Sequence, residues 1–179
     1  MKINIIGPSG SGKTTLSKKL SQTLNIEPIN LDYVFFRHAK DKQREEITEK
    51  EWRQNLNSKL KTNNWIIEGV NPIIEVMDNA DLIIYLRPSL KTALFRQWKR
   101  YVTDPKQRKE HGFKNNLKLS QYLVKQYKEE DDPEKYEDLK YVRVRKLDKL
   151  TEKYKNKVKI LSNNSAIKKF LREIYANLN

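Results

Sequence analysis

The chain has 179 residues, a formal net charge of +14, 34% charged residues and only 37% hydrophobic residues. This length suits one α/β domain with a sizeable core, and the low apolar fraction predicts much exposed helix. The chain has no apolar run of about 18 residues or more, which excludes a helical membrane span. The absence of cysteine excludes disulfides and thiol catalysis, and two histidines cannot build a typical zinc site. An apolar strand pattern at the start leaves no room for a signal peptide, so we expect a cytoplasmic protein.

The net charge has more than one interpretation. Clustered lysine and arginine would neutralise the phosphates of a nucleic-acid partner, but a lysine-rich surface without any single partner would carry the same charge. A positive field would also speed the arrival of polyphosphates at an enzyme. Charge alone identifies no partner. Nucleic acid therefore stays open as a partner, but a small molecule is favoured over it.

The most specific motif lies at residues 7–14, which read GPSGSGKT and match the phosphate-binding pattern G-x-x-x-x-G-K-[ST]. An apolar strand is predicted before it at Lys2–Ile6, and leucines at four-residue spacing predict a helix after it over Thr15–Leu24. In a strand–loop–helix unit, backbone N–H groups and a helix N-terminus surround a triphosphate. The alternative is a glycine-rich turn that only caps a helix, with Lys13 solvated, and the flanking strand and helix disfavour it.

Each position of this loop has a chemical reason. Lys13 would reach the β- and γ-phosphates, and the Thr14 hydroxyl would bind Mg²⁺. The glycines permit backbone angles and a close approach that a side chain would forbid. The predicted cofactors are therefore ATP and Mg²⁺, and the loop residues expected to bind the nucleotide are Gly7, Ser9, Gly10, Ser11, Gly12, Lys13, Thr14 and Thr15.

Apolar runs alternate with helical patterns along the rest of the chain, which predicts parallel βαβ units. Further strands are expected at Glu27–Leu31, Trp65–Glu68, Leu82–Leu86 and Val158–Leu161. Helices are expected at about 45–61, 89–103 and 165–177. The predicted fold class is a single three-layer α/β/α domain with a five-stranded parallel sheet.

Residues 104–156 carry no strand pattern. They open with the basic piece DPKQRKEHG, expected to be helix-poor, and continue with predicted helices at about 114–130 and 133–154. The second of these helices has a proline in its first turn. An insertion before the last strand favours a helical lid over the nucleotide, because basic groups beside a phosphate loop have a role there. The alternative is a pair of solvated helices that brace the core.

Ligands of open parallel sheets lie at the carboxyl ends of the strands, which selects the residues at and after those ends. Asp32 could hold a Mg²⁺-bound water or accept a proton from an attacking hydroxyl, or it could cap a helix. Glu68 could bind magnesium through water or cap a turn. Phe35 and Phe36 could stack on a flat substrate or belong to the core. The predicted metal-binding residues are Thr14, Asp32 and Glu68.

Two arginines on one predicted helix form a second candidate. Arg96 and Arg100 are four residues apart and share a helix face. One guanidinium could stack on a base while the other binds phosphate, or both could be solvated. A basic lid residue would help to neutralise the negative charge of the transition state, and the candidates are Arg108, Arg143 and Arg145. The predicted catalytic residues are Lys13, Asp32, Arg96 and Arg100.

Five pieces of the chain resemble the P-loop kinases of the adenylate kinase-like group. They are IIGPSGSGKTTLSKKL, NLDYVFF, WIIEGVN, ADLIIYLRPSLKTALFRQWKR and VKILSNNSAIKKFL, which together cover most of the chain outside 104–156. Within this group, the ordered series LD, WIIEG and ADLIIYLRP is most similar to the DNA topology modulation (FlaR-like) proteins.

This resemblance implies ATP- and Mg²⁺-dependent phosphoryl transfer to a small-molecule acceptor. It implies that Arg96, eight residues after Pro88, contacts the adenine, and that the loop 162–165 with Asn163 and Ser165 borders it. Residues after the third strand would face the acceptor. The expected acceptor-binding residues are Asp32, Phe35, Arg37, Glu68, Gly69 and Asn71.

Two departures from the group bear on the acceptor. Nucleoside monophosphate kinases usually have Asp-Gly-Phe-Pro-Arg after the third strand, whereas 68–72 read EGVNP and lack the arginine. Arg87 also stands where the most similar relatives have aspartate. A non-phosphorylated acceptor with a hydroxyl near Asp32 therefore fits at least as well as a monophosphate, for which Arg37 could compensate.

Other functions and the oligomeric state stay open at this point. The competing class is a nucleotide-regulated protein acting on or near DNA, with little or no kinase activity and with the positive charge as its contact surface. A slow ATPase without an acceptor is a third reading. The sequence allows a monomer or a homodimer.

Overall fold

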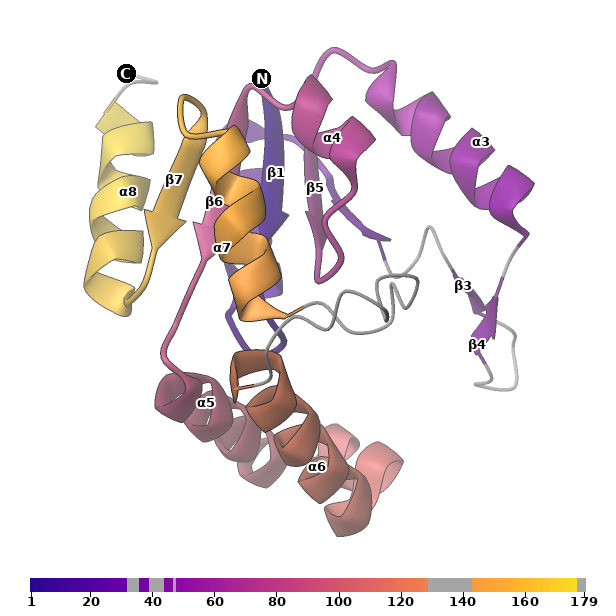
Figure 1. The fold of residues 1–179 in the computed structure, drawn as a ribbon, viewed down its shortest axis with the longest axis vertical. Coiled ribbons are helices and arrows are strands. Elements are labelled where there is room, and N and C mark those ends of the chain that lie inside the picture. The colour runs from indigo at the N-terminus through magenta and orange to yellow at the C-terminus, as the bar shows by residue number, and fades with distance from the viewer. Residues whose placement is uncertain (32–35, 39–43, 47, 129–142, 177–179) are drawn as a thin grey trace.

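The computed structural model describes residues 1–31, 36–38, 44–46, 48–128 and 143–176. Its centre is a sheet of five parallel strands in the order β2-β5-β1-β6-β7 (Figure 1). This confirms the predicted five-stranded parallel sheet. The strands are β1 (Lys2–Ile6), β2 (Pro28–Asn30), β5 (Trp65–Gly69), β6 (Leu82–Leu86) and β7 (Val158–Leu161).

Helices cover both faces of the sheet, which gives the predicted three layers. One face packs on α1 (Lys13–Leu24) and α8 (Asn164–Ala176). The other packs on α3 (Glu49–Leu60), α4 (Ile74–Asn79) and α7 (Val144–Lys153).

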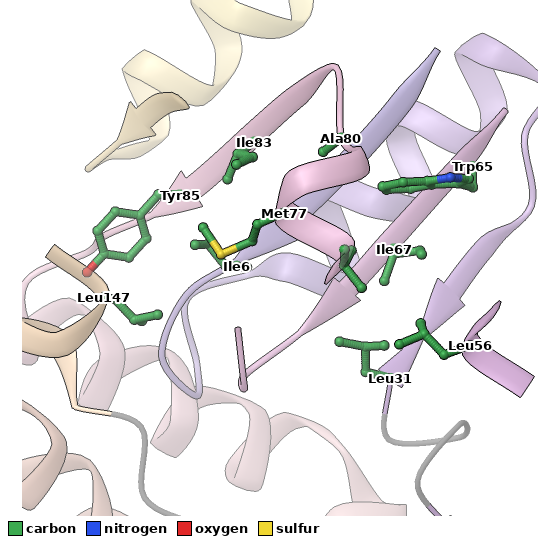
Figure 2. Packing of buried hydrophobic residues seen from close by; sticks show 11 residues of the cluster. Ile6, Leu31, Leu56, Trp65, Ile67, Met77, Ala80, Ile83, Tyr85 and Leu147 are labelled. Carbon is green, nitrogen blue, oxygen red and sulfur yellow. The ribbon is translucent and has the colours of Figure 1, made fainter. Parts of the chain in front are cut away.

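The central strands are buried on both faces, so they read as nearly continuous apolar runs. In β1, Ile3 and Ile5 join the core beneath α1 and α8, and Ile6 joins the opposite core. Figure 2 shows that opposite core, where Met77 of α4 lies near Ile6. Because side chains alternate along a strand, both cores depend on the same five residues of β1.

Two further helices lie beyond the carboxyl ends of the strands. In Figure 1, α5 (Leu90–Thr103) and α6 (Pro105–Lys128) run side by side below the sheet. The Ser89 side chain caps α5 by accepting a hydrogen bond from the Thr92 N–H, so this helix begins where the sequence predicted. A short antiparallel hairpin, β3 (Phe36–His38) and β4 (Arg44–Glu46), was not predicted, nor was α4.

Three predicted boundaries are wrong, each for a local reason. The helix expected from residue 45 begins at Glu49, because Thr48 and Glu51 form a capping box there. The piece expected to be helix-poor after residue 104 is the start of α6, since Pro105 suits a first turn. The helix expected from residue 133 instead begins at Val144, because Arg143 has extended backbone angles. Residues 133–142 lie outside the described part of the chain.

The helices built from the described residues include none with the length and apolar character that a bilayer crossing requires.

Substituting Gly7 tests how tightly the turn after β1 is packed. A Cβ there would lie 2.4 Å from the Leu86 carbonyl oxygen at a backbone φ of 152°. We expect Gly7→Ala to lower the free energy of unfolding by about 3 kcal/mol or more, measured by urea denaturation followed by circular dichroism.

Gly112→Ala is the matched control, because Gly112 also has a positive φ, of 57°, but a Cβ there would meet no atom within 4 Å. Its cost should be limited to the backbone term, about 1–2 kcal/mol. Equal losses in the two variants would contradict the steric argument.

Candidate functional site

The loop between β1 and α1 lies against two backbone segments that follow each other in the chain. Gly7, Gly10 and Gly12 have φ values of 152°, 72° and 98°. A Cβ at Gly7 would meet the end of β6, and one at Gly10 would lie 3.1 Å from the Ala93 carbonyl oxygen of α5. The glycines therefore allow both the turn and the close approach of the loop to its neighbours.

The Lys13 ammonium folds back over this loop. Its Nζ donates hydrogen bonds to the carbonyl oxygens of Gly7 at 3.0 Å and Pro8 at 3.1 Å, and the residue is only 7% exposed. Both of these acceptors are neutral carbonyl groups at the mouth of the loop. A phosphate oxygen would be a stronger, charge-assisted acceptor at the same place.

Donors around Lys13 also fit a phosphate. The Ser11 Oγ is buried and has no hydrogen-bond partner among the described residues. Within that same part of the chain, no side chain caps the N-terminus of the 12-residue helix α1, and its first turn holds no acidic residue. A helix N-terminus with unsatisfied N–H groups attracts an anion. The loop residues therefore fit the phosphates of a nucleotide.

The remaining loop positions complete the rim. Thr14 and Thr15 are exposed in the first turn of α1, and Ser9 is partly exposed in the loop. The Thr14 hydroxyl is thus accessible for the Mg²⁺ predicted there. A cluster of three or more carboxylates or histidines able to hold a metal is absent from the described residues.

Arg96 of α5 joins the loop to the beginning of α8. Its Nη1 donates to the Ser11 carbonyl oxygen at 2.8 Å, and its Nη2 donates to Asn164 Oδ1 at 2.6 Å. Asn163 Oδ1 accepts from the Ala166 N–H at 2.9 Å and so caps this turn. Sequence reasoning placed Asn164 in the loop but gave it no role; its position between Asn163 and Ser165 was the available signal.

Arg100 has a different environment from Arg96. It is exposed and lines a cavity of about 380 Å³ between α5 and α6, together with Gln97 and Tyr101. The two arginines of the predicted pair are one helix turn apart, but Arg96 contacts the loop and Arg100 lines the cavity.

Glu68 lies at the carboxyl end of β5 and is only 3% exposed. Its Oε1 accepts a hydrogen bond from Asn30 Nδ2 of β2 at 3.1 Å. Alternation along β5 puts Glu68 on the same face as Ile66, which packs in the core beneath α1. The carboxylate thus shares its sheet face and its sheet end with the N-terminus of α1.

The other predicted acceptor residues are only partly described. A Cβ at Gly69 would lie 2.6 Å from Leu31 Cδ1, so glycine lets β2 end against β5. Asn71 is partly buried in the turn that follows. Asp32 and Phe35 lie outside the described residues, and Arg37 is described in its backbone alone, in β3.

A partly exposed network of hydrogen bonds joins α7 to the end of β6. Arg87 donates from Nε and Nη2 to the two Asp148 oxygens at 2.7 and 2.8 Å, and the Tyr85 hydroxyl donates to Oδ1 at 2.9 Å. The hydrogen bond to Asp148 raises the Arg87 pKa, and burial followed by that bond raises the Tyr85 pKa. This explains the arginine at position 87: its partner is the carboxylate of α7. Arg143 is the N-cap residue of that helix, and Arg145 lies in its first turn.

The comparisons with known proteins agree with this geometry. The chain belongs to the family described as AAA domain, whose model matches residues 3–118, more than half of its length. Among curated proteins, no match was found.

One solved kinase structure shares the fold, and two others are similar at lower TM-scores. Shikimate kinase from Bacteroides thetaiotaomicron is 16% identical, with a TM-score of 0.52 over 99% of this chain and 98% of that one. Shikimate kinase from Acinetobacter baumannii in complex with shikimate is 18% identical, with a TM-score of 0.49 over 99% and 92%. Deoxyadenosine kinase from M. mycoides with bound dCTP is 15% identical, with a TM-score of 0.46 over 98% and 100%. At 16% identity, the likeness to the first of these structures shows the fold alone, which is P-loop kinase-like.

Tyr127 gives the protein a testable pH dependence. Its hydroxyl donates to the Pro88 carbonyl oxygen at 2.8 Å, and burial raises its pKa from 10.0 to about 12. Because the folded pKa lies above the unfolded one, the stabilisation is complete below pH 10 and is lost as the pH rises toward 12. We expect the urea midpoint to fall over this range. Tyr127→Phe should flatten part of that fall, and an unchanged pH profile in this variant would refute the assignment.

Proposed function

We propose that this protein is an ATP- and Mg²⁺-dependent phosphotransferase acting on a small-molecule acceptor. The observation that carries the proposal is the loop itself. Its buried Lys13 ammonium, its unpartnered Ser11 hydroxyl among the described residues and the uncapped start of α1 converge on one place. Such convergent donors stabilise charge that develops on a transferring phosphoryl group.

The loop residues hold the donor. Lys13 exchanges its two carbonyl acceptors for β- and γ-phosphate oxygens, and backbone N–H groups of residues 9–14 surround them. Thr14, with Asp32 or Glu68 through water, would hold Mg²⁺, which would supply neutralisation of the phosphate charge. Arg96 and the loop with Asn163 and Ser165 border the adenine. A basic residue of the insertion, Arg108, Arg143 or Arg145, would add positive charge there, whereas Arg100 lines the separate cavity between α5 and α6.

The acceptor binds at the ends of β2 and β5. Glu68, Gly69 and Asn71 would face it, with Asp32, Phe35 and Arg37 on the neighbouring segment. Asp32 orients the acceptor hydroxyl and takes its proton as the oxygen bonds to the γ-phosphorus, while the bond to the β–γ bridging oxygen breaks and ADP leaves. Residues 68–72 read EGVNP and lack an arginine that could bind a phosphate group on the acceptor. This supports a non-phosphorylated acceptor.

The narrower family assignment and the lid are parts of the same proposal. The pieces LD, WIIEG and ADLIIYLRP support membership of the DNA topology modulation (FlaR-like) group. The insertion at 104–156 would act as a lid over the nucleotide, and α6 is its described part that lies outside the layers packed on the sheet. The net charge of +14 supports the second candidate, a nucleotide-regulated protein acting on or near DNA.

An ADP-release assay with ATP and Mg²⁺ against nucleosides, nucleoside monophosphates, shikimate-like acids and sugars tests the proposal. We expect one acceptor class to raise ADP release well above background, and Asp32→Asn to remove that increase. ATP binding without any acceptor effect would favour the second candidate, which salt-dependent DNA binding would then support.

Lys13→Ala should lower turnover by a factor of about 100 or more while leaving the urea midpoint nearly unchanged, because Lys13 projects over the loop. Lys18→Ala, an exposed lysine on the same helix, is the matched control and should keep full activity. Unimpaired turnover in Lys13→Ala would remove the mechanism.

A further inference from the structure

The cavity between α5 and α6 is lined by polar, charged and aromatic side chains. Its volume of about 380 Å³ falls in the range of small-molecule pockets. Its lining includes Gln97 and Arg100 from α5 and Asn116, Lys118 and Tyr122 from α6. It lies apart from the bonds by which Arg96 joins the phosphate loop to Asn164.

Two buried amides in this lining have fixed orientations. Gln97 is 3% exposed, and its Nε2 lies 2.7 Å from the Asn116 carbonyl oxygen, which can only accept. The Gln97 side-chain atom that faces this carbonyl must therefore be the amide nitrogen. It also lies 2.9 Å from Asn116 Oδ1, so the oxygen of the Asn116 amide faces Gln97.

This arrangement leaves one amide donor without an acceptor. Asn116 is 5% exposed, and its Nδ2 has no hydrogen-bond partner among the described residues. A flipped amide would set two donors against each other, so the nitrogen cannot exchange places with the oxygen. A buried donor without a partner costs free energy that a bound acceptor would recover.

The charges of the cavity are of one sign. Arg100 and Lys118 line it, and neither forms an ion pair with a carboxylate of the described residues. Tyr101, Leu119 and Tyr122 supply ring and apolar surface beside them. Fixed donors and cations next to flat apolar walls match an anionic group carried on a compact ring.

We propose that the cavity between α5 and α6 is a second binding site, separate from the phosphate loop, for a compact organic anion. The carboxylate or phosphate ester of the ligand accepts from Asn116 Nδ2 and pairs with Arg100 and Lys118, and its ring packs on Tyr101 and Leu119. This site does not depend on phosphoryl transfer, because its lining contains none of the loop residues.

Calorimetric titration of the full chain with phenyl phosphate and, separately, benzoate tests the site and distinguishes the two anionic groups. We expect saturable binding of at least one of them and none of neutral benzyl alcohol. Lys118→Gln and Asn116→Leu should each weaken binding about tenfold or more, because each removes a donor to a charged group. Lys118 is exposed, so its variant tests the site even if Asn116→Leu fails to fold.

Lys114→Gln is the control, since Lys114 is an exposed lysine one turn earlier on α6 and outside the lining. It should leave the affinity unchanged, and saturating ATP with Mg²⁺ should not displace the probe. Absence of binding, an equal loss in Lys114→Gln, or displacement by ATP would each overturn the proposal. Displacement would mean that the anion occupies the nucleotide cleft.

Discussion

The close approach of three backbone segments at the carboxyl end of β1 is the constraint on which the rest of the structure depends. The phosphate loop touches the end of β6 at Gly7 and the first turns of α5 at Gly10, with no space for a Cβ at the first of these positions. Because β6 also pairs with β1, the loop, the sheet and α5 are fixed by one set of contacts. Arg96 then extends that set to the start of α8. This packing positions Lys13 and the other hydrogen-bond donors of the loop.

Much of this arrangement could be predicted from sequence, since its signals are local. The motif at residues 7–14 combines glycines, lysine and a helix start within eight positions, and each has a distinct physical requirement. The buried strand β6 reads as a short apolar run, and the predicted bounds of β6 and of the edge strand β7 are those observed. Glu68 was selected by its place after an apolar run, and the structure puts it on the face and end shared with α1.

The parts that sequence could not supply depend on contacts between distant segments. Arg96 and Arg100 have the same spacing signal, yet only packing decides that one meets Ser11 and the other the α5–α6 cavity. Arg87 reads as a departure from a family pattern until Asp148, far along the chain, appears as its partner. The start of α7 and the hairpin of β3 with β4 likewise follow from tertiary context, which overrides weak local propensity.

The backbone contact between Gly10 and Ala93 has a consequence for how the molecule opens. The two main-chain segments pack closely at this point, and the Arg96 guanidinium also joins them. They cannot separate without losing both the backbone packing and the hydrogen bond from Arg96 to Ser11. We therefore expect the phosphate loop and the first turns of α5 to open as one cooperative unit, with their amide hydrogens exchanging with solvent together. A nucleotide that orders the loop would slow exchange in α5, a helix that follows a different strand of the sheet.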